Sequence, residues 1–378
     1  MAENASWEIP GEEYSTEILR DTTEEESEEP LTTDYTVTTL TVTEAGSYWL
    51  TGYDPINKKA GVAYPNCREV DASECSGDVL IVGNEKNNLL LAGTGKSSLW
   101  GGLDGKDTMQ GGSARDLFWY GNGDSNDTVW DFTPGEEETS DVLVLYSGSV
   151  ASVSRLGTIL TLKMSDGSGL TVQSSSGADD VILYSWDAKD IQKAKIGNSN
   201  GNNTMSYTEE VLYYQGGSKK DILTLSGGTE AKLIWLDGSQ KASYNSIDVI
   251  DGSQSSGADQ LAGTTASESL VGGRAAASLW GGTGSASDTL RAGTGENILF
   301  YGYGEGDDVI QNTYRNDTVM LYNIGLDQIS ATNINGELIS IRTTAGQTLT
   351  VNGKTELFVL GDGANWKPDR NSGTWQKL

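Results

Sequence analysis

The chain of 378 residues contains no histidine. Without histidine it cannot form a Ser-His-Asp or Cys-His catalytic pair, a His-Glu-x-x-His zinc site or any other histidine-ligated metal centre. These exclusions remove the commonest hydrolase and metalloprotease mechanisms. A pair of carboxylates acting on a polysaccharide from a β-helix stays open as an enzymatic alternative, although no pair stands out. We therefore expect no catalytic residues.

Basic residues are also scarce. The chain has 25 Lys and Arg against 54 Asp and Glu, which gives a formal net charge of −29. Such a charge excludes nucleic acid as a partner and disfavours anionic lipid surfaces. It favours either bound cations or mutual repulsion that keeps the protein in solution.

Long apolar runs are missing as well. No run of eighteen apolar residues occurs, so no membrane insertion is expected. The N-terminus lacks the basic-then-apolar pattern of a secretory signal. For an acidic β-protein of this composition we expect a secreted location, at the cell surface or in the extracellular medium. Export would then use a C-terminal signal or a leader that has been removed.

Two cysteines, Cys67 and Cys75, lie close together in the chain. A local disulfide between them suits an oxidising exterior and is our expectation. Two free thiols are the alternative.

The sequence contains a tandem duplication. Residues 98–102 (SLWGG) recur at 278–282, residues 118–121 align with 299–302, and the strand-like residues 141–146 align with 317–322. Fixed-period similarity in a chain rich in glycine and poor in proline is typical of a repeat architecture. The fold question therefore becomes what one copy looks like.

Each copy contains a shorter repeat of about nine or ten residues. A glycine pair allows a tight turn, and the following triplet is a minimal strand whose large apolar middle residue points inward. Two repeats would close a coil of roughly eighteen residues, which places Leu99 above Phe118 and Leu90 above Met109. The sequence thus predicts an all-β fold of two tandem parallel β-roll or β-solenoid modules with flanking antiparallel strands.

Residues 118–132 (FWYGNGDSNDTVWDF), followed by an acidic turn and the strand at 141–145, carry a family resemblance. The pattern resembles the G-G-x-G-x-D-x-U-x nonapeptide of the repeats-in-toxin, or hemolysin-type calcium-binding, proteins. The resemblance covers roughly residues 83–146 and 263–322. It implies a parallel β-roll, bound calcium and one-step secretion read from a C-terminal segment. Several repeats depart from it, since the sixth position is not aspartate at Asn88, Ser97, Glu268, Ala277 and Asn297.

Calcium needs six to eight oxygen ligands, and stacked turns on one edge of a roll offer carboxylates beside glycine carbonyls. We expect one cluster in each copy, with a further position at Asp116. In the alternative, these side chains cap the turns with ordinary hydrogen bonds. The candidate calcium ligands are Asp104, Asp107, Asp116, Asp124, Asp127, Asp288, Glu305, Asp307 and Asp308.

Large aromatic residues occupy outward positions of one predicted sheet. If Leu99 and Phe118 point inward, Trp100 and Trp119 must point outward one above the other, and Trp280 and Phe300 repeat this arrangement. A row of exposed aromatic side chains predicts an interface with another subunit or a glycan. The alternative is that strands at 142–146 and 159–162 fold over the row.

The expected organisation has three parts. Residues 1–34 form an acidic N-terminal arm, either flexible or ordered on assembly; residues 35–210 form the first β-roll module and residues 211–378 the second. The expected function is that of a secreted, non-enzymatic structural protein. Copies would assemble with calcium into a surface layer, filament or extracellular matrix. The alternatives are a polysaccharide-active β-helix enzyme and the ligand-binding region of a secreted adhesin.

Overall fold

The structure is a computed structural model that describes residues 32–54, 59–135, 139–176, 180–185, 190–240 and 242–378. Its internal contacts divide the chain into unit 1, Met1–Ser199, and unit 2, Asn200–Leu378. This boundary precedes the expected one at residue 210, because strand β20 (Asn203–Ser206) pairs with β22 (Asp221–Thr224) of unit 2. The expected arm at 1–34 lies almost wholly outside the described residues. Its last part forms β1 (Thr32–Thr33), which pairs with β6 (Val62–Ala63).

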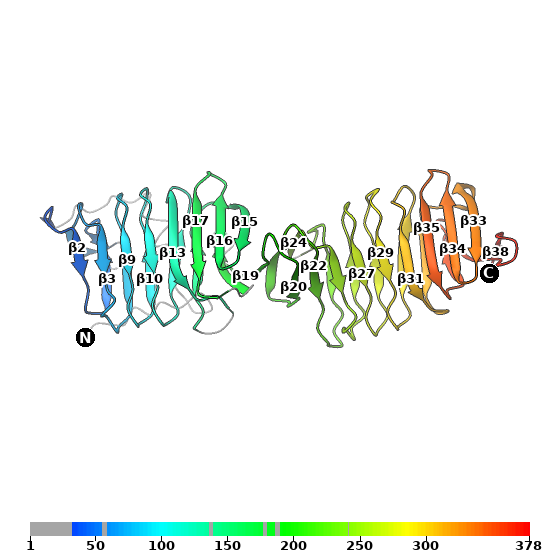
Figure 1. Ribbon diagram of the computed structural model, residues 1–378, viewed down its shortest axis with the longest axis horizontal. Coiled ribbons are helices and arrows are strands. Elements are labelled where there is room, and N and C mark those ends of the chain that lie inside the picture. Colours follow the sequence, from blue (N-terminus) through cyan, green and yellow to red (C-terminus); the bar gives the residue numbers. More distant parts are fainter. Residues whose placement is uncertain (1–31, 55–58, 136–138, 177–179, 186–189, 241) are drawn as a thin grey trace. The chain divides into compact units, whose positions relative to one another are not determined.

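Unit 1 consists of two sheets of stacked strands (Figure 1). We call one of them the polar sheet of unit 1. Its parallel strands are β2 (Thr39–Thr41), β7 (Glu69–Asp71), β9 (Leu89–Leu91), β11 (Thr108–Gln110), β13 (Asn126–Phe132) and β17 (Gly169–Ser174), followed by antiparallel β16 (Ile159–Met164) and β15 (Val150–Leu156). We call the other the aromatic sheet. Its parallel strands are β3 (Gly46–Trp49), β8 (Val79–Val82), β10 (Ser97–Trp100), β12 (Leu117–Tyr120), β14 (Val142–Leu145) and β18 (Asp180–Ser185), followed by antiparallel β19 (Asp190–Ile196). Strands β4 (Tyr53–Asp54) and β5 (Lys59–Ala60) form a separate antiparallel pair.

Unit 2 repeats this plan. The parallel strands of its polar sheet are β20, β22, β25 (Val249–Asp251), β27 (Ser269–Val271), β29 (Thr289–Arg291), β31 (Val309–Thr313) and β35 (Thr348–Gly353), followed by antiparallel β34 (Leu338–Thr343) and β33 (Ile329–Asn335). Those of its aromatic sheet are β23 (Leu233–Trp235), β26 (Gln260–Ala262), β28 (Ser278–Trp280), β30 (Ile298–Gly302), β32 (Thr318–Tyr322) and β36 (Leu357–Val359), followed by antiparallel β37 (Asn365–Pro368) and β38 (Trp375–Lys377). Strands β21 (Val211–Gln215) and β24 (Ser243–Asn245) form a further parallel pair. The all-β class, the parallel coils and the flanking antiparallel strands are as predicted.

The core of each unit is a stack of inward side chains, one from each strand. Leu99 lies in register with Phe118, and Leu90 with Met109, as the repeat spacing predicts. All four are fully buried. The inward residue in the middle of each strand packs against the equivalent residue of the next coil, so the stacking of neighbouring coils creates the core.

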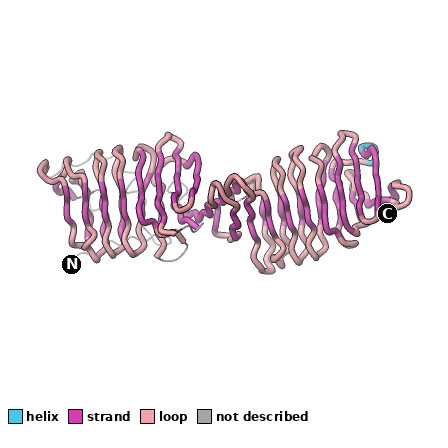
Figure 2. The backbone as a smooth tube through the Cα atoms, in the orientation of Figure 1, coloured by secondary structure: helices cyan, strands magenta, loops and turns pink. Residues whose placement is uncertain are grey.

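The turns between the strands stack so that the backbones of neighbouring coils lie close together (Figure 2). A Cβ atom on Gly112 would overlap the carbonyl oxygen of Gly93 in the preceding coil, so this turn requires glycine. Equivalent turn residues hydrogen-bond across 19 positions, as Asn88 does with Asp107, or across 20, as Glu268 does with Asp288. The coils are therefore slightly longer than expected.

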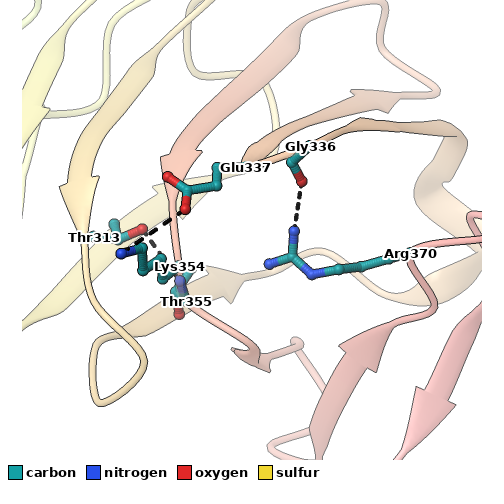
Figure 3. Close-up of polar contacts among 6 residues, drawn as sticks. All are labelled: Thr313, Gly336, Glu337, Lys354, Thr355 and Arg370. Atoms are coloured by element: carbon teal, nitrogen blue, oxygen red, sulfur yellow. Dashed lines mark hydrogen bonds and ion pairs between the residues drawn. The ribbon is translucent and has the colours of Figure 1, made fainter.

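Antiparallel strands close the C-terminal part of unit 2 (Figure 3). Arg370, which follows β37, donates from Nη1 to the carbonyl oxygen of Gly336 at 2.6 Å, in the turn between β33 and β34. Glu337 of the same turn lies 3.9 Å from Lys354 Nζ. The first contact ties the hairpin of β33 and β34 to the segment after β37, and the second ties it to the residue that follows β35. The only helical element among the described residues is the short 3-10 helix η2 (Leu326–Gln328).

Candidate functional site: the buried acid ladders

Acidic side chains at the sixth position of the repeats form columns that run across the coils. In the first column of unit 1, Asp127 Oδ1 accepts the backbone N–H of Asp107 at 2.8 Å. Asp107 Oδ1 in turn accepts the N–H of Asn88 at 2.6 Å. We call such a column an acid ladder. The side chain from each coil bonds the backbone of the preceding one, so the ladder fixes the register of the stack.

A second acid ladder stands at the other edge of unit 1. Asp141 Oδ1 accepts the N–H of Asp116 at 2.9 Å, and Asp116 Oδ1 accepts that of Ser97 at 2.8 Å. Here the remaining oxygens also have donors. Asp116 Oδ2 accepts the N–H of Gly112 at 2.6 Å, and Asp141 Oδ2 accepts that of Thr133 at 2.7 Å.

Unit 2 has the same two ladders. Asp308 Oδ1 accepts the N–H of Asp288 at 3.0 Å, and Asp288 Oδ1 accepts that of Glu268 at 2.8 Å. At the other edge Asp317 Oδ1 accepts the N–H of Asn297 at 2.8 Å. Asn297 continues the second ladder, since its Oδ1 accepts the N–H of Ala277 at 3.1 Å. Glu268 instead accepts the N–H of Thr264 in its own turn at 3.2 Å, so the first ladder of unit 2 ends at this residue.

Two carboxylates of the first ladder are incompletely bonded. Asp107 and Asp127 are 1% and 2% exposed, and the Oδ2 atom of each has no hydrogen-bond partner within the described residues. A buried charged oxygen without a partner is costly. These two side chains therefore need a proton or a cation.

Burial is the main cause of raised pKa values at the ladders. It raises the pKa of Asp107 to about 7 and that of Asp127 to about 8, with added repulsion from neighbouring carboxylates. Burial likewise raises the pKa of Asp116 to about 6, Asp124 to about 7, Asp141 to about 7, Asp288 to about 7, Glu305 to about 7 and Asp308 to about 6.

A tryptophan, an acid and a tyrosine meet beside the ladder in unit 1. Trp100 Nε1 donates to Asp124 Oδ2 at 3.2 Å, and the Tyr146 hydroxyl donates to Asp124 Oδ1 at 2.5 Å. The two rings pack edge to face at 5.4 Å. Asp124 also accepts the N–H of Gly121 at 2.9 Å, so the protein satisfies both of its oxygens.

The same cluster recurs in unit 2 with glutamate in place of aspartate. Trp280 Nε1 lies 3.1 Å from both Glu305 Oε1 and the Tyr322 hydroxyl. Glu305 Oε2 accepts the N–H of Gly302 at 2.6 Å. These acids thus bridge an outward tryptophan to the turn that follows the next strand.

Most of the acidic residues singled out from the sequence are buried in or beside the ladders. Asp104 and Asp307 are not, since both are exposed; Asp307 accepts the N–H of Thr348 at 2.7 Å. Sequence reasoning missed four buried ladder acids whose shared signal is their place just before a strand triplet. They are Asp141, Asp221, Asp259 and Asp317.

The ladders differ from a preformed metal site. Among the described residues, no three acidic or cysteine side chains converge closely enough to hold a metal ion. Asp107 and Asp127 fit calcium in ligand type, and each has a buried oxygen to which no described residue donates a hydrogen bond. Any further ligands there would have to be backbone carbonyls or water.

The outward aromatic residues lie in register as expected. Trp100 is paired with Trp119 and Trp280 with Phe300, and all four are half-buried. The later strands do not fold over this row, although Tyr146 packs against Trp100, and Val142 and Val144 pack against Trp119. Strand β14 continues the same sheet beside β12, and β16 belongs to the polar sheet.

The expected disulfide is not formed, because Cys67 and Cys75 are both free and buried. Cys67 precedes β7 and Cys75 follows it, so the strand separates them. Each thiol donates within its own turn, to the carbonyl of Glu69 at 3.2 Å and of Gly77 at 3.6 Å. Burial raises the pKa of the Cys67 thiol.

Comparison with known proteins adds little. No family model matches the chain, and no curated protein matches it. Among solved structures, the extracellular lipase LipA from Serratia marcescens is similar over 75% of this chain and 37% of the lipase chain, with 14% identity and a TM-score of 0.18. A likeness this distant carries no argument about function. No helix in the described part of the chain is long and apolar enough to cross a membrane.

Proposed function

We propose that this protein is a secreted, non-enzymatic structural protein whose copies assemble in the presence of calcium. The assembly would be a surface layer, a filament or an extracellular matrix. Secretion is inferred from the acidic composition and from the resemblance of residues 118–132 to repeats-in-toxin sequences.

The observation that carries this proposal is the pair of stacked, buried carboxylates at Asp107 and Asp127. Each has an oxygen with no donor in the part of the chain that the structure describes, and a pKa near or above 7. At neutral pH, calcium would supply positive charge to these oxygens, for which the described part of the chain provides no hydrogen-bond donor. The coils that these residues connect would then be most ordered outside the cell, where calcium is plentiful.

A carbohydrate-active enzyme is the competing proposal. Acids with a pKa near 7 are typical of general acid catalysts, and Asp124 and Glu305 have such values. However, Asp124 is 0% and Glu305 4% exposed, and their oxygens already bond Trp100, Tyr146 and Trp280. This arrangement favours a structural role for both acids.

Electron microscopy and light scattering of the purified protein, in chelator and in millimolar calcium, test the proposal. We expect ordered assemblies only with calcium. The double variant Asp107→Asn/Asp127→Asn should lose the calcium requirement, whereas Asp104→Asn, at an exposed acid, should behave as the wild type. Protein that stays monomeric in calcium and depletes a polysaccharide would establish the enzyme instead. Monomeric protein that binds a cell-surface glycan would establish an adhesin.

A further inference from the structure

The outer face of the aromatic sheet of unit 2 carries two rows of uncharged side chains, which we call the aromatic stripe. The first row runs in register across the sheet: Trp235, Ala262, Trp280, Phe300, Met320 and Val359. The second row lies two residues earlier on each strand: Leu233, Gln260, Ser278, Ile298, Thr318 and Leu357. Leu233 and Ile298 are 42% and 37% exposed.

The polar sheet of the same unit has the opposite character. The corresponding outward row there is Asp251, Val271, Arg291, Gln311 and Asn352. Arg291, Gln311 and Asn352 are exposed, as is usual for a sheet face in contact with water. The two outer faces come from the same coils, so the lack of charge on one of them is a property of that face.

In unit 1 the outward side chains of the same face pack against one another. Its outward row includes Val82 and Val144, which are 3% and 2% exposed, and Val144 corresponds to Met320 of unit 2 in the duplicated sequence. Val142 and Val144 pack against Leu117 and Trp119. In unit 2, Ile298 is exposed where Leu117 is half-buried, and Met320 is half-buried where Val144 is buried.

We propose that the aromatic stripe packs against the same stripe of a second copy of this chain, which names the contact surface of the assembly proposed above and rests on that proposal. Copies with a formal charge of −29 repel one another. Contact between two stripes brings no like charges of the stripe side chains together and removes apolar side chains from water. A face that meets its own copy needs only a two-fold axis and no second complementary surface.

The size of the stripe predicts how strong one contact is. Six strands spaced about 4.8 Å apart, each with three residues of about 3.3 Å, give a footprint of roughly 300 Å². A stable dimer buries about 800 Å² on each partner. One stripe therefore supports a weak contact that depends on protein concentration, and long-lived assemblies would combine it with other contacts.

Sedimentation velocity of the full chain in calcium, over a range of concentrations, tests this surface. Ile298→Lys and Leu233→Lys each place a charge on an exposed stripe position. We expect them to raise the concentration at which copies associate by tenfold or more. Gln311→Lys adds the same charge to the exposed face of the polar sheet and should leave that concentration unchanged. Circular dichroism confirms that each variant is folded.

The outcomes separate this inference from the proposed function. If the wild type stays monomeric at every concentration in calcium, assembly itself is refuted and the stripe contact with it. If the wild type associates and both stripe variants associate equally well, only the stripe contact is overturned. If the Gln311→Lys control weakens association as much as the stripe variants do, the added charge alone explains the effect. The proposal that the stripe is the contact surface is then overturned.

Discussion

Asp127 accepts the backbone N–H of Asp107 at 2.8 Å, so an acid of one coil holds the backbone of the coil before it. Both residues are buried, and one oxygen of each has no hydrogen-bond donor among the described residues. The bond that aligns the coils therefore brings two carboxylates onto adjacent rungs of one ladder. Stability must depend on how their charge is neutralised.

Asp127→Asn removes one charge and keeps the side-chain oxygen that accepts the Asp107 N–H. In chelator at pH 8 we expect the variant to be more stable than the wild type by roughly 1–3 kcal/mol. At pH 4 the difference should largely vanish, because burial keeps Asp127 protonated there. Urea unfolding at both pH values measures this, with Asp104→Asn as the control. A variant less stable than the wild type at pH 8 contradicts the account.

Gly112→Ala tests the close approach of the turns. A Cβ atom at this position would overlap the carbonyl oxygen of Gly93, so the coils must move apart. We expect a loss of about 1–3 kcal/mol. Gly228→Ala, which meets nothing within 4 Å, should change stability by less than about 0.5 kcal/mol. Equal effects of the two substitutions in thermal unfolding would show that the turn is not close-packed.

Separate fragments ending at Ser199 and starting at Asn200 test the division of the chain. Coils contact mainly their neighbours, so each fragment retains most of its stabilising contacts. We expect β-type circular dichroism and cooperative unfolding from both in calcium. If one fragment is unfolded alone and folds on addition of the other, the two units share a core.

Thiol counting tests the state of the cysteines. Alkylation of the unfolded protein without reductant should modify both Cys67 and Cys75. In the folded protein, burial and the raised pKa of Cys67 should slow its reaction greatly compared with the unfolded chain. Mass spectrometry measures both. A mass two units lower, with no thiols modified, would restore the disulfide.

The sequence was sufficient to predict the stacking of the coils. Leu99 on Phe118 and Leu90 on Met109 follow from the repeat spacing and the two-residue alternation of strands, which are local properties. Trp100 was correctly placed outward for the same reason. Its half-burial was not predicted, because it depends on Tyr146 and Asp124 of later coils.

The direction of the acidic side chains could not be predicted from spacing. A repeat places Asp107 and Asp127 in one column, but it does not show whether their oxygens face a cation or the backbone N–H of the next coil. The prediction of a disulfide was wrong for a similar reason. Nearness of Cys67 and Cys75 in sequence does not show that β7 lies between them.

Unfolding of the wild type at pH 5 and pH 8, each in chelator and in millimolar calcium, tests the central claim most directly. Folding raises the pKa of these acids from an ordinary value near 4 to about 6 to 8. Their protonated forms therefore contribute fully to stability at a pH below about 4, and this contribution is lost as the pH rises through about 6 to 8. In chelator the melting temperature should therefore be lower at pH 8 than at pH 5. Calcium at about 100 times its dissociation constant should restore roughly 2.7 kcal/mol per site at pH 8 and much less at pH 5. A melting temperature that is unaffected by calcium at pH 8, or that in chelator is higher at pH 8 than at pH 5, would contradict the account.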